Sequence, residues 1–194
     1  MDRYTAMTRP LILLAAVLAL TACEQAAPPA APAPKEPSPI PAQTGDDVVV
    51  HLAARPELTT FSSALEAAGL LGVLHGAGPW TVLAPDNAAF DRIPVAERES
   101  LLQPENQAEL RRRLAFHIVP GRLSLGEIAR RAQMEEGGKL TLTTLEGGQV
   151  VLEDAGAGRW AVKDAGGGRA IITEGDEVAA NGLIHRLDSS LKPG

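Results

Sequence analysis

Residues 139–187 read KLTLTTLEGGQVVLEDAGAGRWAVKDAGGGRAIITEGDEVAANGLIHRL, a pattern typical of β-structure. Apolar and polar residues alternate at its start, as they do along a strand whose two faces meet different surroundings. The expected strands are residues 140–143, 149–153, 159–164, 170–173 and 182–187. Glycine-rich segments separate them, and glycine tolerates the positive φ angles of tight turns. The pattern therefore predicts an antiparallel meander in the second half of the chain.

The sequence before this stretch has the period of helices. Leu58, Phe61, Leu65 and Ala68 recur on one helical face, and Gly69 is expected to end that helix. The other elements expected are helices at 70–74, around Phe90, after Pro94 and at 104–115, and a strand at 80–84 followed by the N-cap candidates Asp86 and Asn87. Residues 48–50 (VVV) follow Asp46 and Asp47, so a strand and a capped helix both remain open there. Helices followed by strands predict an α+β fold, with helices segregated against a mainly antiparallel sheet.

The beginning of the chain resembles the signal of bacterial lipoproteins. An apolar run at residues 11–20 is too short to span a bilayer, and it ends in Leu-Thr-Ala directly before Cys23. We expect residues 1–22 to be removed and the Cys23 sulfur to carry a diacylglycerol. The chain has only this one cysteine, which cannot form an intrachain disulfide. The alternative is an ordinary signal peptide that happens to end in cysteine.

Residues 23–47 are rich in proline and alanine, and they have few apolar side chains large enough to build a core. We expect an extended, semi-rigid tether, or alternatively a ligand for a proline-binding module. Residues 48–193 then have the size of a single domain. The formal net charge of the chain is −6, which excludes the electrostatic footprint of a nucleic-acid-binding protein.

Three motifs in register resemble those of the fasciclin domain family. They are residues 81–90 (TVLAPDNAAF), 116–123 (FHIVPGRL) and 181–188 (NGLIHRLD). The resemblance implies a compact α+β domain with a wedge-like β-sandwich core and helices on one side. It also implies cell adhesion or extracellular interaction, not catalysis. Phe116 stands where the family motif has tyrosine. Residues 174–178 (EGDEV) lack the Asp-Ile pair that is associated with integrin binding in some animal relatives, so integrin binding is not expected.

Candidate chemistry along the chain is sparse. His117 continues the apolar face of Leu110 and Leu114, and His185 lies in an alternating strand, so both are expected to be hydrogen-bonded core residues. No histidine pair has metal-ligand spacing, and no G-x-S-x-G motif is present, so no metal, cofactor or catalytic residue is predicted. Residues 111–113 (RRR) are expected to form a solvated face, paired with Glu105 or Glu109 along the helix. The alternative is contact with an anionic polysaccharide or lipid headgroup.

These observations predict a lipid-anchored envelope protein whose single domain mediates non-catalytic interaction with a protein or glycan. Its partners would be the membrane, through the lipid on Cys23, and an extracytoplasmic molecule; the domain itself is expected to be monomeric. The candidate partner-binding residues are Phe116, His117 and the Asp176-Glu177 loop. Glu24 follows Cys23, where aspartate is associated with inner-membrane retention in enteric bacteria; the absence of aspartate favours the outer membrane, with the domain facing the periplasm or the cell surface. The alternatives are a periplasmic carrier of a small apolar ligand, with a pocket between helices and sheet, and an enzyme of unrecognised type.

Overall fold

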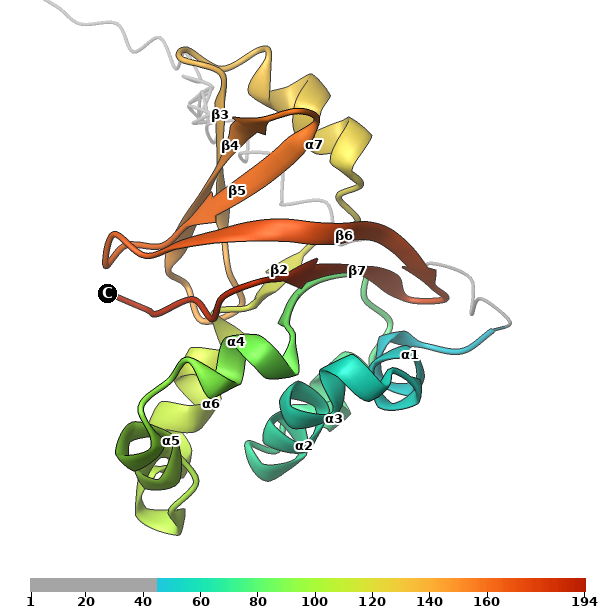
Figure 1. The fold of residues 1–194 in the computed structure, drawn as a ribbon. Coiled ribbons are helices and arrows are strands. Elements are labelled where there is room, and N and C mark those ends of the chain that lie inside the picture. The colour runs from blue at the N-terminus through green and yellow to red at the C-terminus, as the bar shows by residue number, and fades with distance from the viewer. Residues whose placement is uncertain (1–44) are drawn as a thin grey trace, which may run out of the picture. The chain divides into compact units, whose positions relative to one another are not determined.

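The computed structural model describes residues 45–194 (Figure 1). The predicted signal peptide, Cys23 and nearly all of the predicted tether lie outside the described residues. Seven strands form one sheet in the described region: β1 Trp80–Pro85, β2 Ile118–Pro120, β3 Lys139–Thr143, β4 Gln149–Gly156, β5 Arg159–Lys163, β6 Arg169–Ala179 and β7 Gly182–Leu187. Their order is β2-β1-β7-β6-β5-β4-β3. The predicted antiparallel meander is confirmed from β3 to β7, whereas β1 pairs parallel with β7 and antiparallel with β2.

The long strand β6 belongs to both halves of the sheet. Residues 169–171 pair with β5, and the residues from Ile172 onward pair with β7 through two register irregularities that end at Glu177. Irregularities of this kind bend and twist a strand. In the turn after β3, Leu145 N donates to Ile118 O of β2 at 2.7 Å, so the sheet nearly closes on itself. The prediction of a strand limited to 170–173 was therefore too short, because the charged residues that follow carry no β pattern of their own.

The helices lie mainly on one side of the sheet, as predicted (Figure 1). They are α1 Val48–Ala54, α2 Thr59–Ala67, α3 Leu71–Leu74, α4 Asn87–Asp91, α5 Val95–Leu101, α6 Gln107–Ala115 and α7 Leu125–Ala132, with 3-10 turns η1 Pro56–Leu58 and η2 Pro104–Asn106. The expected helix at 104–115 thus begins with a 3-10 turn at its proline. None of the helices in residues 45–194 combines the length and apolar character needed to cross a membrane.

α7 lies apart from the other helices, against β3 and β4, and it is not among the helices expected from the sequence (Figure 1). Its signal is a capping box: Ser124 precedes the helix, and Glu127 follows three residues later. The Ser124 hydroxyl oxygen accepts a hydrogen bond from Glu127 N at 3.2 Å. Ile128 and Ala132 form the buried face of the helix. The apolar pattern of this helix is short and lies between turn residues, so helical periodicity alone does not predict the helix.

Residues 48–50 are helical, which settles the alternative that the sequence left open. An Asp47 carboxylate oxygen accepts from Val49 N and Val50 N at 3.0 Å each, which caps two free amide groups of the first turn. Asn181, just before β7, fixes the same region: its side-chain oxygen accepts from Val48 N at 2.9 Å. Its amide nitrogen donates to Leu74 O in α3 at 2.6 Å and to Gly76 O, just after α3, at 3.0 Å. One side chain thereby ties two helices to the sheet.

Two apolar clusters hold the fold. Leu58, Phe61, Leu65 and Ala68 are all buried, which confirms the predicted helical face, and they belong to the cluster under the helices. The second cluster lies inside the curved β-sheet and beneath α7. Its members include Leu83, Phe116, Ile128, Val150, Leu152, Val162 and Leu187. Burying each large apolar side chain contributes about 1.5–3 kcal/mol relative to leaving it exposed.

Candidate functional site

His117 is buried where the end of α6 meets the C-terminal segment. Its Nδ1 lies 2.8 Å from Arg113 O, and its Nε2 lies 3.0 Å from Leu191 N. A carbonyl oxygen can only accept and an amide N–H can only donate, so Nδ1 carries the proton and Nε2 accepts. Burial lowers the pKa of His117 to about 4, so the ring is neutral near pH 7. Both nitrogens are engaged, and the ring joins the helix end to the chain terminus.

His185 has the same arrangement on β7. Its Nε2 donates to Leu123 O at 2.8 Å, and its Nδ1 accepts from Asp176 N at 3.1 Å. Burial lowers the pKa of His185 as well. The ring therefore connects three separated segments: β7, the approach to α7, and the irregular part of β6. These contacts show how the structure uses the histidine predicted to be hydrogen-bonded in the core.

The candidate partner-binding residues Phe116 and His117 do not reach the surface. Phe116 is 0% exposed and His117 is 1% exposed. The Phe116 ring lies so close to Gly148 that a Cβ added there would be 2.6 Å from Phe116 Cε2. In this structure both side chains act inside the domain, so they cannot meet a partner at its surface. The physical reason is that the family motif places its aromatic ring in the core and its histidine between two backbone segments.

Asp176 and Glu177 lie in β6 rather than in the expected loop. Asp176 has φ +61°, a left-handed conformation that aspartate tolerates better than most residues. Its carboxylate accepts from Leu125 N, the first residue of α7, at 2.8 Å. Glu177 pairs with Arg55 at 2.8 Å and with His51 at 3.0 Å. Asp176 is exposed, yet both residues already serve to attach helices to the sheet.

The three consecutive arginines of α6 are also engaged within the domain. Arg113 pairs with Glu97 at 2.7 Å and, as predicted, with Glu109 at 3.0 Å. The other two reach across the surface: Arg112 pairs with Glu146 and donates to Gly194 O, and Arg111 donates to Ala68 O and Gly69 O. Exposed ion pairs of this kind contribute little stability individually. They do reduce the positive charge available to an anionic ligand.

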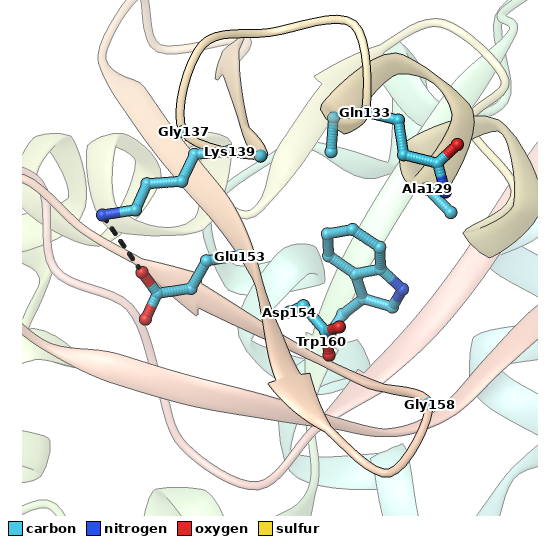
Figure 2. Close-up of a pocket in the computed structure, with 10 residues that line it drawn as sticks. Ala129, Gln133, Gly137, Lys139, Glu153, Asp154, Gly158 and Trp160 are labelled. Carbon is cyan, nitrogen blue, oxygen red and sulfur yellow. Dashed lines mark ion pairs between the residues drawn. The ribbon is translucent and has the colours of Figure 1, made fainter.

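A hollow of about 540 Å³ opens between the end of α7 and strands β3, β4 and β5 (Figure 2). We call it the Trp160 hollow; the residues that define it are Gln133, Gly138, Lys139, Glu153, Asp154 and Trp160. Figure 2 shows the Trp160 ring in the middle of these residues, with the Lys139–Glu153 ion pair to one side. No motif in the sequence indicates this hollow, because its residues come from four separate segments.

A second, smaller cavity of about 150 Å³ lies among α2, α4, α5 and α6. Phe90, Ile93, Leu101 and Leu110 are among its apolar lining residues. It lies among the helices, whereas the predicted carrier pocket would lie between helices and sheet. Within residues 45–194, no group of three or more histidine, cysteine, aspartate and glutamate side chains is placed to hold a metal ion.

Comparison with known proteins agrees with the three motifs. The family model of the fasciclin domain matches residues 56–193, a region that contains all three. Protein sll1483 of Synechocystis sp. is 32% identical over 146 residues, covering 75% of this chain and 73% of that protein. The cell surface glycolipoprotein MPB83 of Mycobacterium bovis is 33% identical over 119 residues, covering 58% of this chain and 52% of that protein.

A solved structure has the same fold. It is a FAS1 domain pair from the insect cell adhesion molecule Fasciclin I, which this chain matches with a TM-score of 0.68 at 14% sequence identity. The match covers 76% of this chain and 51% of that one. The likeness confirms the predicted α+β class of the fasciclin domain, and the core that was expected as a wedge-like β-sandwich is a single, nearly closed seven-stranded sheet.

Proposed function

This chain belongs to the fasciclin domain family, and we propose that it is a lipid-anchored envelope protein whose domain binds a protein or glycan partner without catalysing a reaction. The observation that carries this proposal is the hydrogen bonding of the two buried histidines. Both ring nitrogens of His117 and of His185 are bonded to backbone groups of the same domain. Neither ring is free to transfer a proton or bind a metal. The two buried histidines therefore stabilise the fold, and we expect partner binding to take place at the surface.

The names of related proteins support a location outside the cytoplasm. MPB83 is named a cell surface glycolipoprotein, and Fasciclin I is named a cell adhesion molecule. The lipoprotein-type signal before Cys23 agrees with such a location, since lipidation of this cysteine would hold the domain at a membrane through its proline-rich tether. Tethering raises the effective concentration of a binding domain near its membrane, so even a weak surface contact can give useful avidity.

Membrane attachment is tested by cell fractionation together with labelling by a palmitate analogue. The intact protein should fractionate with membranes and carry the label. The Cys23→Ser variant should lose both, because serine provides no thiol for acylation. Label and membrane association that persist in the variant would contradict anchoring through this residue.

Partner binding is tested by photo-crosslinking in cells, with a benzophenone amino acid placed at one exposed position at a time. Met134, Val178 and Leu102 are 67%, 60% and 56% exposed; Met134 directly follows Gln133 of the Trp160 hollow, Val178 lies on β6, and Leu102 lies at the end of α5. A discrete adduct at one position that is absent at the others would support an interaction domain and locate its surface. The absence of adducts at all three would contradict stable partner binding.

The carrier alternative receives little support from the apolar cavity among the helices. The apolar cavity of about 150 Å³ is smaller than the roughly 300–1,000 Å³ of most ligand pockets. A dry cavity of this size admits a molecule no larger than benzene. Thermal stabilisation by fatty acids or sterols would favour the carrier over the interaction domain.

A further inference from the structure

We infer that the Trp160 hollow is a binding subsite for a neutral sugar ring of a polysaccharide. This inference rests on the proposed function and assigns its partner to the glycan class. The hollow has the volume of a ligand pocket, about 540 Å³. It also has the composition that sugars require, an aromatic surface surrounded by hydrogen-bonding groups.

The aromatic surface is the indole of Trp160 on β5. The side chain packs against the apolar cluster inside the sheet, and the residue is only partly buried. Figure 2 shows the ring within the hollow, between Gln133 and Ala129 of the α7 region and the chain near Gly158. A rigid aromatic ring anchored from behind presents a flat apolar surface at little entropic cost. The carbon-bound hydrogens of a pyranose ring form a flat apolar face that can stack on such a surface.

Hydrogen-bonding groups surround the indole. Gln133 is exposed, and its side chain has no hydrogen-bond partner among the described residues. Asp154 uses one carboxylate oxygen to accept from Gly156 N at 2.7 Å, and no described residue bonds its second oxygen. An amide and a carboxylate together offer donors and acceptors to sugar hydroxyl groups. These groups are held by secondary structure, at the end of α7 and on β4, so the site is largely preformed.

Glycines leave the rim of the hollow open. Gly137, Gly138 and Gly158 have φ angles of +84°, +65° and +72°, and nothing lies within 4 Å of a Cβ placed on any of them. Positive φ angles favour glycine, and a rim without side chains allows a chain of linked sugars to pass over the backbone. The shape therefore suits an internal unit of a polymer as well as its end.

The charges around the hollow select against anionic ligands. Lys139 is the only cationic side chain lining the described hollow, and it pairs with Glu153 at 3.6 Å. Glu153 also pairs with Lys163 at 2.9 Å and with Arg169 at 3.8 Å, so its charge is balanced, whereas Asp154 has no ion-pair partner among the described residues. A phosphate or uronate would be repelled by the Asp154 carboxylate, whereas a neutral sugar would meet it only as a hydrogen-bond acceptor.

The inference is tested with the purified full-length protein and a panel of oligosaccharides. The probes are neutral gluco-, manno-, galacto- and N-acetylhexosamine oligomers, with uronate oligomers as the charged comparison. Binding is measured by an immobilised array and then by titration calorimetry. At least one neutral oligomer should bind, and the uronates should bind more weakly.

Two substitutions at Trp160 form a matched pair. Trp160→Phe and Trp160→Leu both shorten the side chain and keep its apolar contact with the cluster, but only phenylalanine keeps an aromatic face. The leucine variant should weaken binding about tenfold, and the phenylalanine variant by a smaller factor. Thermal melts of the two variants check that they fold alike. Equal binding by wild type and the leucine variant would place the sugar elsewhere and overturn the inference.

Two further variants avoid the core altogether. Gln133→Ala removes an exposed amide and should weaken neutral-sugar binding severalfold with an unchanged melting temperature. Asp154→Asn keeps an oxygen for Gly156 N but removes the charge, so it should raise affinity for the uronates relative to wild type. An unchanged affinity for neutral sugars in Gln133→Ala, or an unchanged affinity for uronates in Asp154→Asn, would contradict the assigned contacts.

The outcomes separate this inference from the proposed function. If no neutral oligomer binds while crosslinking captures a protein at another face, the sugar subsite is wrong and the interaction domain stands. If the uronates bind more tightly than neutral oligomers, the assigned sugar class is wrong. If neither sugars nor crosslinking yield a partner, both proposals fail.

Discussion

Lowering the pH from 7 to 4 should weaken this domain through His117 in particular. The pKa of His117 is lowered by burial to about 4, against 6.5 for an unperturbed histidine. Between these two values the unfolded chain holds a proton on this ring and the folded chain does not. Stability therefore rises with pH across this window: the contribution is complete above about pH 6.5 and is lost as the pH falls towards 4.

The size of the effect follows from the pKa shift. One pKa unit corresponds to about 1.4 kcal/mol, so the loss across the window is about 3 kcal/mol for this one residue. This is a large fraction of the 5–15 kcal/mol by which domains are typically stable. A protonated Nε2 cannot accept from Leu191 N, so the C-terminal segment should loosen before the rest of the domain.

The measurement is urea unfolding of the wild type and of His117→Gln at intervals from pH 4 to pH 7. Glutamine provides an amide in place of the ring and does not titrate. It should lower stability at pH 7 by about 1–3 kcal/mol, because a buried hydrogen bond is lost or distorted. Other groups, including His185 with its lowered pKa, remain in both proteins, so they largely cancel in the difference.

The two stability curves should converge as the pH falls, and amide exchange at Leu191 should accelerate in the wild type over the same range. Parallel curves from pH 4 to pH 7 would refute the reasoning. They would mean that His117 has the same proton affinity folded and unfolded, and that its two hydrogen bonds do not hold the ring neutral.

Three further perturbations test the packing and the caps by thermal and urea denaturation. Gly182→Ala should destabilise the domain strongly, since a Cβ there would overlap the Trp80 carbonyl oxygen. In the matched control Gly72→Ala the new Cβ meets no atom within 4 Å, so this change should be neutral or stabilising by up to about 1 kcal/mol. Equal effects of the two substitutions would contradict the close approach of β7 to β1. Asn181→Ala should cost about 2–4 kcal/mol because it leaves three backbone groups without their partner, and a loss below about 1 kcal/mol would show that water replaces the side chain. Asp47→Ala should cost about 1 kcal/mol through the lost N-cap of α1 and Asp47→Asn clearly less, because asparagine also caps helices; equal losses would mean that the charge, which also faces His75, matters more than the cap.

Much of the fold could be predicted from the sequence because its signals are local. The helical face of Leu58, Phe61 and Leu65 and the meander from β3 to β7 depend on the spacing of residues near one another. The side-chain caps also act over two or three residues, as the Asp86 carboxylate does when it accepts from Ala89 N at 2.8 Å. The capping box of α7 is equally local, but the apolar pattern of the helix that follows it is too short to predict a helix.

The candidate site could be predicted only in part. The sequence indicated that His117 and His185 would be bonded in the core, yet it also offered Phe116 and His117 as partner-binding residues. A motif shows which residues a family keeps together, but it does not show which of them face inward. That depends on whether another segment covers them, as Leu191 and Gly148 do here.

The sequence by itself determined the α+β class, the family and most element boundaries, since periodicity, turn chemistry and three motifs are properties of short segments. Only the tertiary structure decided the parallel pairing of β1 with β7, the extension of β6 through Glu177, and the assembly of the Trp160 hollow. Each of these joins residues far apart in the chain. Such contacts depend on the summed packing and hydrogen bonding of the whole domain, and no local pattern of residues encodes them.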